Sequence, residues 1–98
     1  MNNVIDGKIV GYEQLSVGAS VVQLSKYKEF EQYGELGAYI LVEGQPIRFK
    51  VGEDPTASEG FPLGIDMLLF LPHDNMPQFR MIAESQTTKV DVLYVEVV

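Results

Sequence analysis

The sequence predicts an all-β protein: an antiparallel β-sandwich or small barrel of about six to eight short strands. Three observations lead to this prediction. Stretches such as Ile47 to Val51 alternate apolar and polar residues, which is typical of strands half buried against a core. Clusters of Gly, Pro, Asp and Asn separate these stretches. No strand–long helix–strand unit occurs, which disfavours a parallel α/β sheet.

The strands are predicted in chain order from their alternation and their flanking turn residues. Residues 38–51 hold two of them on either side of Glu43-Gly44-Gln45-Pro46, a composition that predicts an antiparallel hairpin. The remaining strands are expected at 9–15, 19–25, 66–71, 78–85 and 90–98.

Residues 26–33 are the one candidate helix. Tyr27, Phe30 and Tyr33 are spaced by three, as on one face of a short helix, with Ser25 as N-cap and Gly34 just past the end. A run this short is marginal without packing. An irregular excursion is the alternative.

Length and composition restrict the function. The 98 residues suffice for one β-sandwich domain, residues 1–98, with residues 1–8 expected as a flexible arm. The formal net charge of −7 disfavours nucleic acid as a partner, because that requires a basic patch. We expect no signal peptide and no membrane span. The absence of cysteine excludes disulfides and fits folding in a reducing cytoplasm.

The titratable residues form no familiar catalytic or metal-binding pattern. His73 is the only histidine and is interpreted as a solvated turn residue beside Asp74. The loop after Val51 is rich in oxygen ligands but lacks the spacing of an EF-hand. Its candidate ligands are Glu53, Asp54, Ser58 and Glu59. We therefore predict a non-enzymatic protein without a metal or other cofactor.

Two segments, 67–71 and 90–98, are apolar on both faces. A single sandwich has one interior, so the second face needs a cover. The cover is either a partner subunit or the segment 26–33. The candidate interface residues are Met67, Leu69, Val92, Tyr94 and Val98.

Aromatic residues offer a second kind of surface. Exposed rings on a β-sandwich can bind carbohydrate by stacking, and Tyr27, Tyr33 and Tyr39 are the candidate platform. The alternative is that these tyrosines cover the rim of the core with their hydroxyl groups in water.

The order of motifs from residue 36 to residue 98 carries a resemblance. The matching residues are Glu43, Gly44, Ile47, Arg48, Phe49, Asp54, Pro55, Thr56, Ala57, Gly60, Phe79, Arg80, Ile82 and Tyr94. In this order they resemble a group of small phage and prophage virion proteins. The resemblance implies a jelly-roll-like β-sandwich, often an oligomeric decoration or attachment component.

The resemblance also implies a function. The expected protein is a bacteriophage virion structural protein that decorates or stabilises a capsid through protein–protein contacts. It would be made in the host cytoplasm, and the three-fold positions of capsids suggest a homotrimer. The alternative is a carbohydrate-binding module of a phage host-recognition structure.

A structural role is expected for the motif itself. Its residues are Glu43, Gly44, Arg48, Asp54, Pro55, Thr56, Gly60 and Arg80. Arg48 is expected to reach a carboxylate in the following loop and to pin that loop against the strand.

Overall fold

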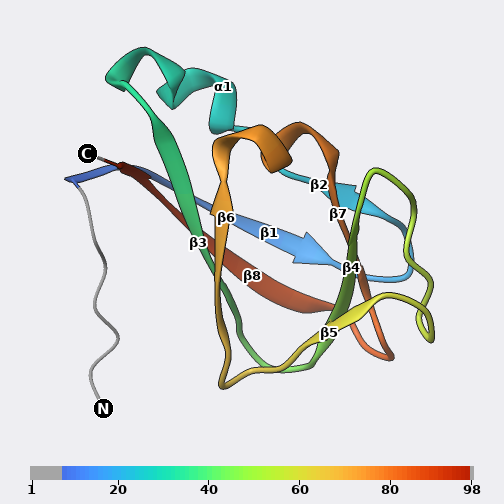
Figure 1. Ribbon diagram of the computed structural model, residues 1–98. Coiled ribbons are helices and arrows are strands. Elements are labelled where there is room, and N and C mark those ends of the chain that lie inside the picture. The colour runs from blue at the N-terminus through green and yellow to red at the C-terminus, as the bar shows by residue number, and fades with distance from the viewer. Residues whose placement is uncertain (1–7, 98) are drawn as a thin grey trace.

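The computed structural model describes residues 8–97 and confirms an antiparallel β-sandwich (Figure 1). Sheet A has the strand order β1-β8-β3-β6, and sheet B has the order β2-β7-β4-β5. The strands are β1 (Lys8–Val17), β2 (Val22–Gln23), β3 (Leu36–Val42), β4 (Ile47–Val51), β5 (Phe61–Leu63), β6 (Leu68–Pro72), β7 (Phe79–Ala83) and β8 (Thr88–Glu96). The arm predicted for residues 1–8 lies outside the described residues, except for Lys8, which begins β1.

The strand pairings are nested. β1 pairs with β8, β2 with β7, β3 with β6 and β4 with β5, all antiparallel. The two halves of the chain therefore run side by side, as the legs of one long hairpin whose tip is the β4–β5 loop. Successive pairs alternate between the sheets, and the β3–β8 and β4–β7 pairings complete each sheet.

The core lies between the two sheets and follows the two-residue period of the strands. Inward-facing residues of β3 and β8 are almost fully buried, while those of sheet B include Ile47, Phe79 and Met81 at zero exposure. Phe49 packs on Phe79 with ring centroids 5.1 Å apart. The inward residues of β3 and β8 are Leu36, Ala38, Ile40, Val42, Thr88, Val90, Val92 and Tyr94.

The hairpin predicted for residues 38–51 is wrong. β3 belongs to sheet A and β4 to sheet B, so the connection crosses between the sheets. Gly44 turns the chain with φ +71°, a conformation that glycine adopts without strain. The Thr88 hydroxyl holds this turn, donating to the Glu43 carbonyl at 2.7 Å and accepting the Gln45 N–H at 3.1 Å. Alternation marks a half-buried strand, but it does not specify which sheet the strand joins.

The helix predicted for residues 26–33 is confirmed as α1 (Tyr27–Phe30) followed by the 3-10 turn η1 (Glu31–Tyr33). Gly34 ends η1 as expected. Ser25 is not the N-cap, since Lys26 holds that position without a side-chain cap. The segment sits at one end of the sandwich in Figure 1. A second 3-10 turn, η2 (His73–Gln78), joins β6 to β7.

The buried carboxylate of Glu13 anchors this segment. It accepts the Lys26 N–H at 3.0 Å and hydroxyl hydrogen bonds from Ser25 at 2.6 Å and Tyr94 at 2.5 Å. Phe30 packs on the Tyr94 ring, with centroids 5.1 Å apart. The segment therefore covers the end of the sandwich and the inward side of β8. These contacts do not place the segment over the outer face of sheet A.

Candidate interaction surface

The outer face of sheet A is apolar and aromatic. One row crosses all four strands, because the register pairs Tyr12 with Leu93, Leu93 with Tyr39, and Tyr39 with Phe70. Tyr12 is 51% exposed and Phe70 is 41% exposed. The Tyr39 and Phe70 rings meet edge to face at 5.2 Å. The apolar side chains on neighbouring rows are Ile9, Leu41 and Leu68. Water-facing strands normally carry polar residues at such positions, so this face is suited to a protein contact.

One corner of this face is polar. The Tyr12 hydroxyl donates to Asp91 at 2.7 Å, and the Gln14 amide donates to both Asp91 and Glu43 at 3.0 Å. The hydrogen bond with Asp91, and the charge on that carboxylate, raise the pKa of Glu43 above its usual 4.5. Burial raises the pKa of Asp91, but hydrogen bonds from Tyr12, Glu43 and Gln14 outweigh it and hold that pKa below 3.8. The corner gives the apolar face a hydrogen-bonding, acidic rim.

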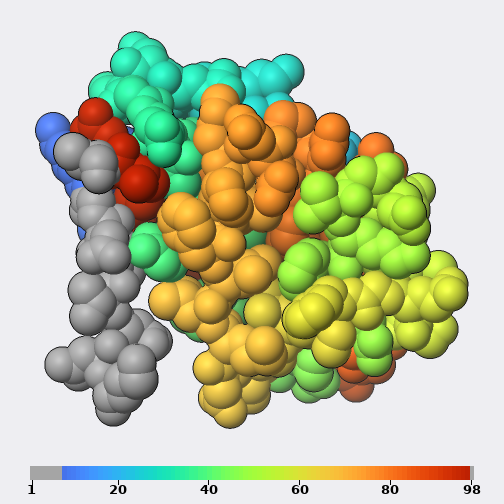
Figure 2. Space-filling model, in the orientation of Figure 1, coloured from blue at the N-terminus to red at the C-terminus, as the bar shows by residue number. Residues whose placement is uncertain are grey.

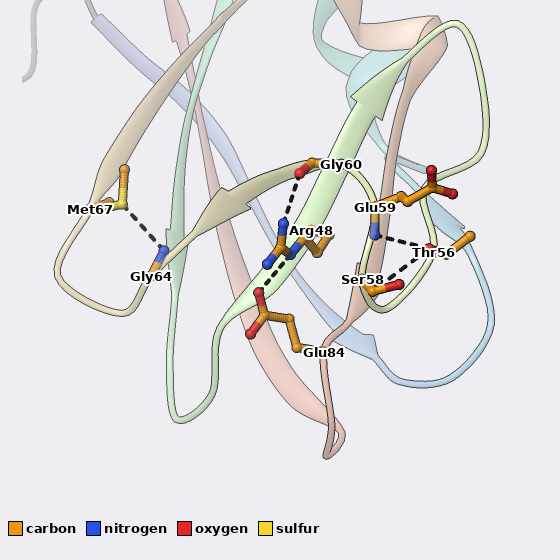
Figure 3. Close-up of polar contacts among 8 residues, drawn as sticks. All are labelled: Arg48, Thr56, Ser58, Glu59, Gly60, Gly64, Met67 and Glu84. Carbon is orange, nitrogen blue, oxygen red and sulfur yellow. Dashed lines mark hydrogen bonds and ion pairs between the residues drawn. The ribbon is translucent and has the colours of Figure 1, made fainter.

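The outer face of sheet B is charged and internally paired. Arg48 donates through Nε to Glu84 at 2.7 Å and through Nη1 to the Gly60 carbonyl at 3.1 Å (Figure 3). Lys50 lies directly opposite Arg80 in the register. Such like charges repel, and the β4–β5 loop supplies an acid to each.

These two ion pairs join the β4–β5 loop to the sheet. Lys50 pairs with Glu53 at 2.9 Å, and Arg80 pairs with Asp54 at 2.8 Å. The hydrogen bond with Glu53 raises the pKa of Lys50. Two carboxylates of the predicted oxygen-rich loop are therefore paired with basic residues of the sheet.

Several residues of the motif that was expected to be structural make contacts within the chain. Pro55 is the buried residue of the β4–β5 loop. The Thr56 hydroxyl accepts the backbone N–H groups of Ser58 at 3.3 Å and Glu59 at 2.9 Å, closing the loop on itself (Figure 3). The prediction that Arg48 pairs with a carboxylate of this loop is wrong, because its partner is Glu84 of the β7–β8 turn. The loop is still pinned, through the Gly60 carbonyl.

A second apolar patch lies at edge strand β5. A hollow of about 440 Å³ is lined by apolar side chains of β4 and β5, with Lys50 and Glu53 at its margin. Phe61 is 63% exposed and Val51 is 41% exposed. In Figure 2 the yellow-green loop, β5 and the orange β6 form one continuous stretch of surface. We call this region the β5 hollow; its apolar residues are Phe49, Val51, Phe61 and Pro62.

The predicted interface residues divide between surface and core. Met67 is 46% exposed in the β5–β6 turn, where its sulfur accepts the Gly64 N–H (Figure 3). Leu69 faces inward and packs against the core. Val92 and Tyr94 are fully buried, so their assignment to an exposed interface is wrong. The outward residue between them is Leu93, because successive side chains alternate. Val98 lies outside the described residues.

The predicted tyrosine platform is not assembled as expected. Tyr27 is 9% exposed and belongs to the core, so it offers no ring to a sugar. Tyr33 is 49% exposed at the end of η1, whereas Tyr39 is half buried on the outer face of sheet A. Tyr12, which the sequence did not single out, is more exposed than either Tyr27 or Tyr39.

Two titratable residues are used in structural contacts. Burial raises the pKa of Glu13, but hydrogen bonds from Ser25, Tyr94 and the Lys26 backbone outweigh it and hold that pKa below 4.5. Glu13 is 4% exposed and saturated by these donors, so its carboxylate does not reach a substrate. His73, expected to be solvated, is half buried and pairs with Glu31 at 2.5 Å. Among residues 8–97, no three histidine, cysteine or carboxylate side chains gather as a metal site.

Comparisons with protein-family models, curated proteins and solved structures return no match to this chain. Within the described part of the chain, no helix is long and apolar enough to cross a lipid bilayer. The described surface has three main features: one apolar sheet face with an acidic corner, a second apolar patch at β5, and a charged face paired within the chain.

Proposed function

We propose that this chain is a non-enzymatic structural protein of a bacteriophage virion, and that it assembles through the outer face of sheet A. The observation that carries the proposal is the apolar row Tyr12–Leu93–Tyr39–Phe70, which crosses the whole sheet and leaves Tyr12 and Phe70 about half exposed. An exposed apolar row of this kind stabilises a complex when another protein covers it, because apolar surface is then removed from water. The jelly-roll connectivity proposed with this function is supported by the nested strand pairings.

The occupant we propose for this face is a second copy of the chain. Each copy carries two different apolar patches, the outer face of sheet A and the β5 hollow. Contact between unlike patches is heterologous, and it closes into a ring when the rotation permits. A ring of three suits the three-fold positions of a capsid, where the protein would decorate or stabilise the particle.

The experiment is light scattering after size-exclusion chromatography at micromolar concentration. The wild type is expected to elute as an oligomer of defined size. Leu41→Asp places a charge on the outer face of sheet A and should yield a folded monomer, because a buried unpaired carboxylate is costly. Phe61→Ser should have the same effect from the other patch. Ser20→Asp adds the same charge at the exposed β1–β2 corner and serves as the control.

A wild-type chain that is monomeric at these concentrations would contradict the assembly. Loss of the oligomer in the Leu41 variant alone would point to a two-fold contact between identical faces. The virion assignment has its own test: cryo-electron microscopy of particles with and without the protein should show added density on the shell.

A further inference from the structure

A pocket of about 310 Å³ lies at one end of sheet A, between β3, β6 and η2. We call it the corner pocket. Its apolar walls are Leu36, Phe70, Pro72 and Val97, and its polar walls are Glu35, His73 and Asp74. These polar groups lie outside both the apolar row of sheet A and the β5 hollow. The volume is at the lower end of the roughly 300–1,000 Å³ that small-molecule sites occupy, so the ligand would be small.

The aromatic wall is held in place by the sheet. Gly37 pairs with Pro72 in the register, and a Cβ on Gly37 would lie 2.7 Å from the Phe70 ring and 2.8 Å from Val97. Both side chains thus lie across bare backbone, and a larger residue at position 37 would displace them. The Tyr39 and Phe70 rings also meet edge to face, with their centroids 5.2 Å apart. The ring is therefore fixed before any ligand arrives, which reduces the entropy cost of binding.

Contacts with neighbouring elements hold the polar wall in place. His73 pairs with Glu31 through Nε2, which joins η2 to η1. The Val97 N–H donates to the Glu35 carbonyl at 2.7 Å and fixes the backbone beside that side chain. Neither Glu35 nor Asp74 forms an ion pair with another described residue. Their carboxylates are left as hydrogen-bond acceptors next to an ordered aromatic ring.

We propose that the corner pocket binds one unit of an uncharged sugar. Adjacent hydroxyl groups of a sugar can donate to the Glu35 and Asp74 carboxylates, and such charge-assisted hydrogen bonds are among the stronger ones. The C–H face of the sugar would pack on Phe70, whose ring face is electron-rich. Phosphorylated or acidic sugars are disfavoured because two carboxylates would repel them. The site differs from the predicted platform of Tyr27, Tyr33 and Tyr39. It shares Phe70 with the outer-face row of sheet A, so an oligomer that covers this row would also cover the aromatic wall, and the Leu41→Asp monomer is the form that leaves it open.

The test is an amide NMR titration of the full chain with glucose, galactose, mannose and N-acetylglucosamine. At least one sugar is expected to shift Gly37, Phe70, His73 and Asp74 in a saturable way, with a millimolar dissociation constant. Asp74→Asn and Glu35→Gln should each weaken binding about tenfold, because each removes a hydrogen bond to a charged group. Asp66→Asn, an exposed carboxylate in the β5–β6 turn, is the matched control.

Three results would overturn the proposal: no saturable shift with any sugar in either the wild type or the Leu41→Asp variant, binding by the Asp74 and Glu35 variants as tight as by the wild type, or a response to arginine amide in place of sugars, which would indicate a pocket for a basic side chain. Titrating the Leu41→Asp variant in parallel separates the two proposals. Sugar binding by that variant would stand whether or not the wild type assembles.

Discussion

The two sheets of the sandwich differ in the side chains that their outer faces expose. Sheet B keeps Arg48, Lys50 and Arg80 outside, each paired with a carboxylate, and its inward residues are apolar. Sheet A turns an apolar row outward and buries a charge, Glu13, on its inner side. Sheet B is thus complete as a water-facing surface. Sheet A uses the buried carboxylate of Glu13 to hold α1, and its outer face exposes an apolar row with Asp91 at one corner.

The largest expected effect compares two neighbours on β3. Ile40 is fully buried, and Leu41 beside it is 38% exposed on the outer face of sheet A. Ile40→Ala should lower the free energy of unfolding by about 3 kcal/mol through lost packing and the resulting cavity. Leu41→Ala should lower it by less than about 1 kcal/mol in dilute solution. Urea unfolding followed by circular dichroism measures both. Equal losses would mean that the two sides of β3 do not differ as described.

The next effect concerns the inward charge. Glu13→Gln places an amide N–H₂ group, a donor, opposite the hydroxyl donors of Ser25 and Tyr94. We expect a loss of about 2 to 3 kcal/mol, since buried donors lose a charged acceptor. The pH dependence follows from the lowered pKa of Glu13. Its contribution to stability is complete above the ordinary value of 4.5 and is lost as the pH falls through the lower, folded value.

Thermal unfolding between neutral and acidic pH checks this sign. The wild type should lose stability over that acidic range more steeply than Glu13→Gln, because the variant has no carboxylate at this position. Parallel curves for the two proteins would show that Glu13 does not carry the dependence.

The smallest effect concerns the outward charges of sheet B. Arg48 makes two hydrogen bonds from a partly buried position, with 28% of its side chain exposed. Arg48→Met should cost about 1.5 to 2 kcal/mol, because it leaves Glu84 and the Gly60 carbonyl without their donors. Lys50→Met removes a solvent-exposed pair with Glu53 and should leave the melting temperature almost unchanged. If the Lys50 variant is the less stable of the two, the loop is held by the outer pair.

Local patterns predicted seven of the eight strands and the helical segment at 26–33, but they missed the short edge strand β5 (Phe61–Leu63). Alternation in 47–51 is confirmed because it reflects burial of a single face. Tyr27 and Phe30 of the predicted helix pack against the core, whereas Tyr33 is exposed. The missed residue with most structural weight is Glu13, and its only sequence signal was a lone acid within the apolar β1. Leu93 was missed because its strand, 90–98, is apolar on both faces, so the sequence does not indicate which face is outward.

By itself, the sequence determined that this chain folds as short antiparallel strands with a single helical turn, since residue period and turn chemistry act between near neighbours. Tertiary structure alone decided that β3 and β4 part into different sheets, that Tyr94 points inward while Leu93 points outward, and that Arg48 finds Glu84. The physical reason is that pleated strands offer two equivalent faces and many possible partners. Only simultaneous packing of all eight strands selects among them.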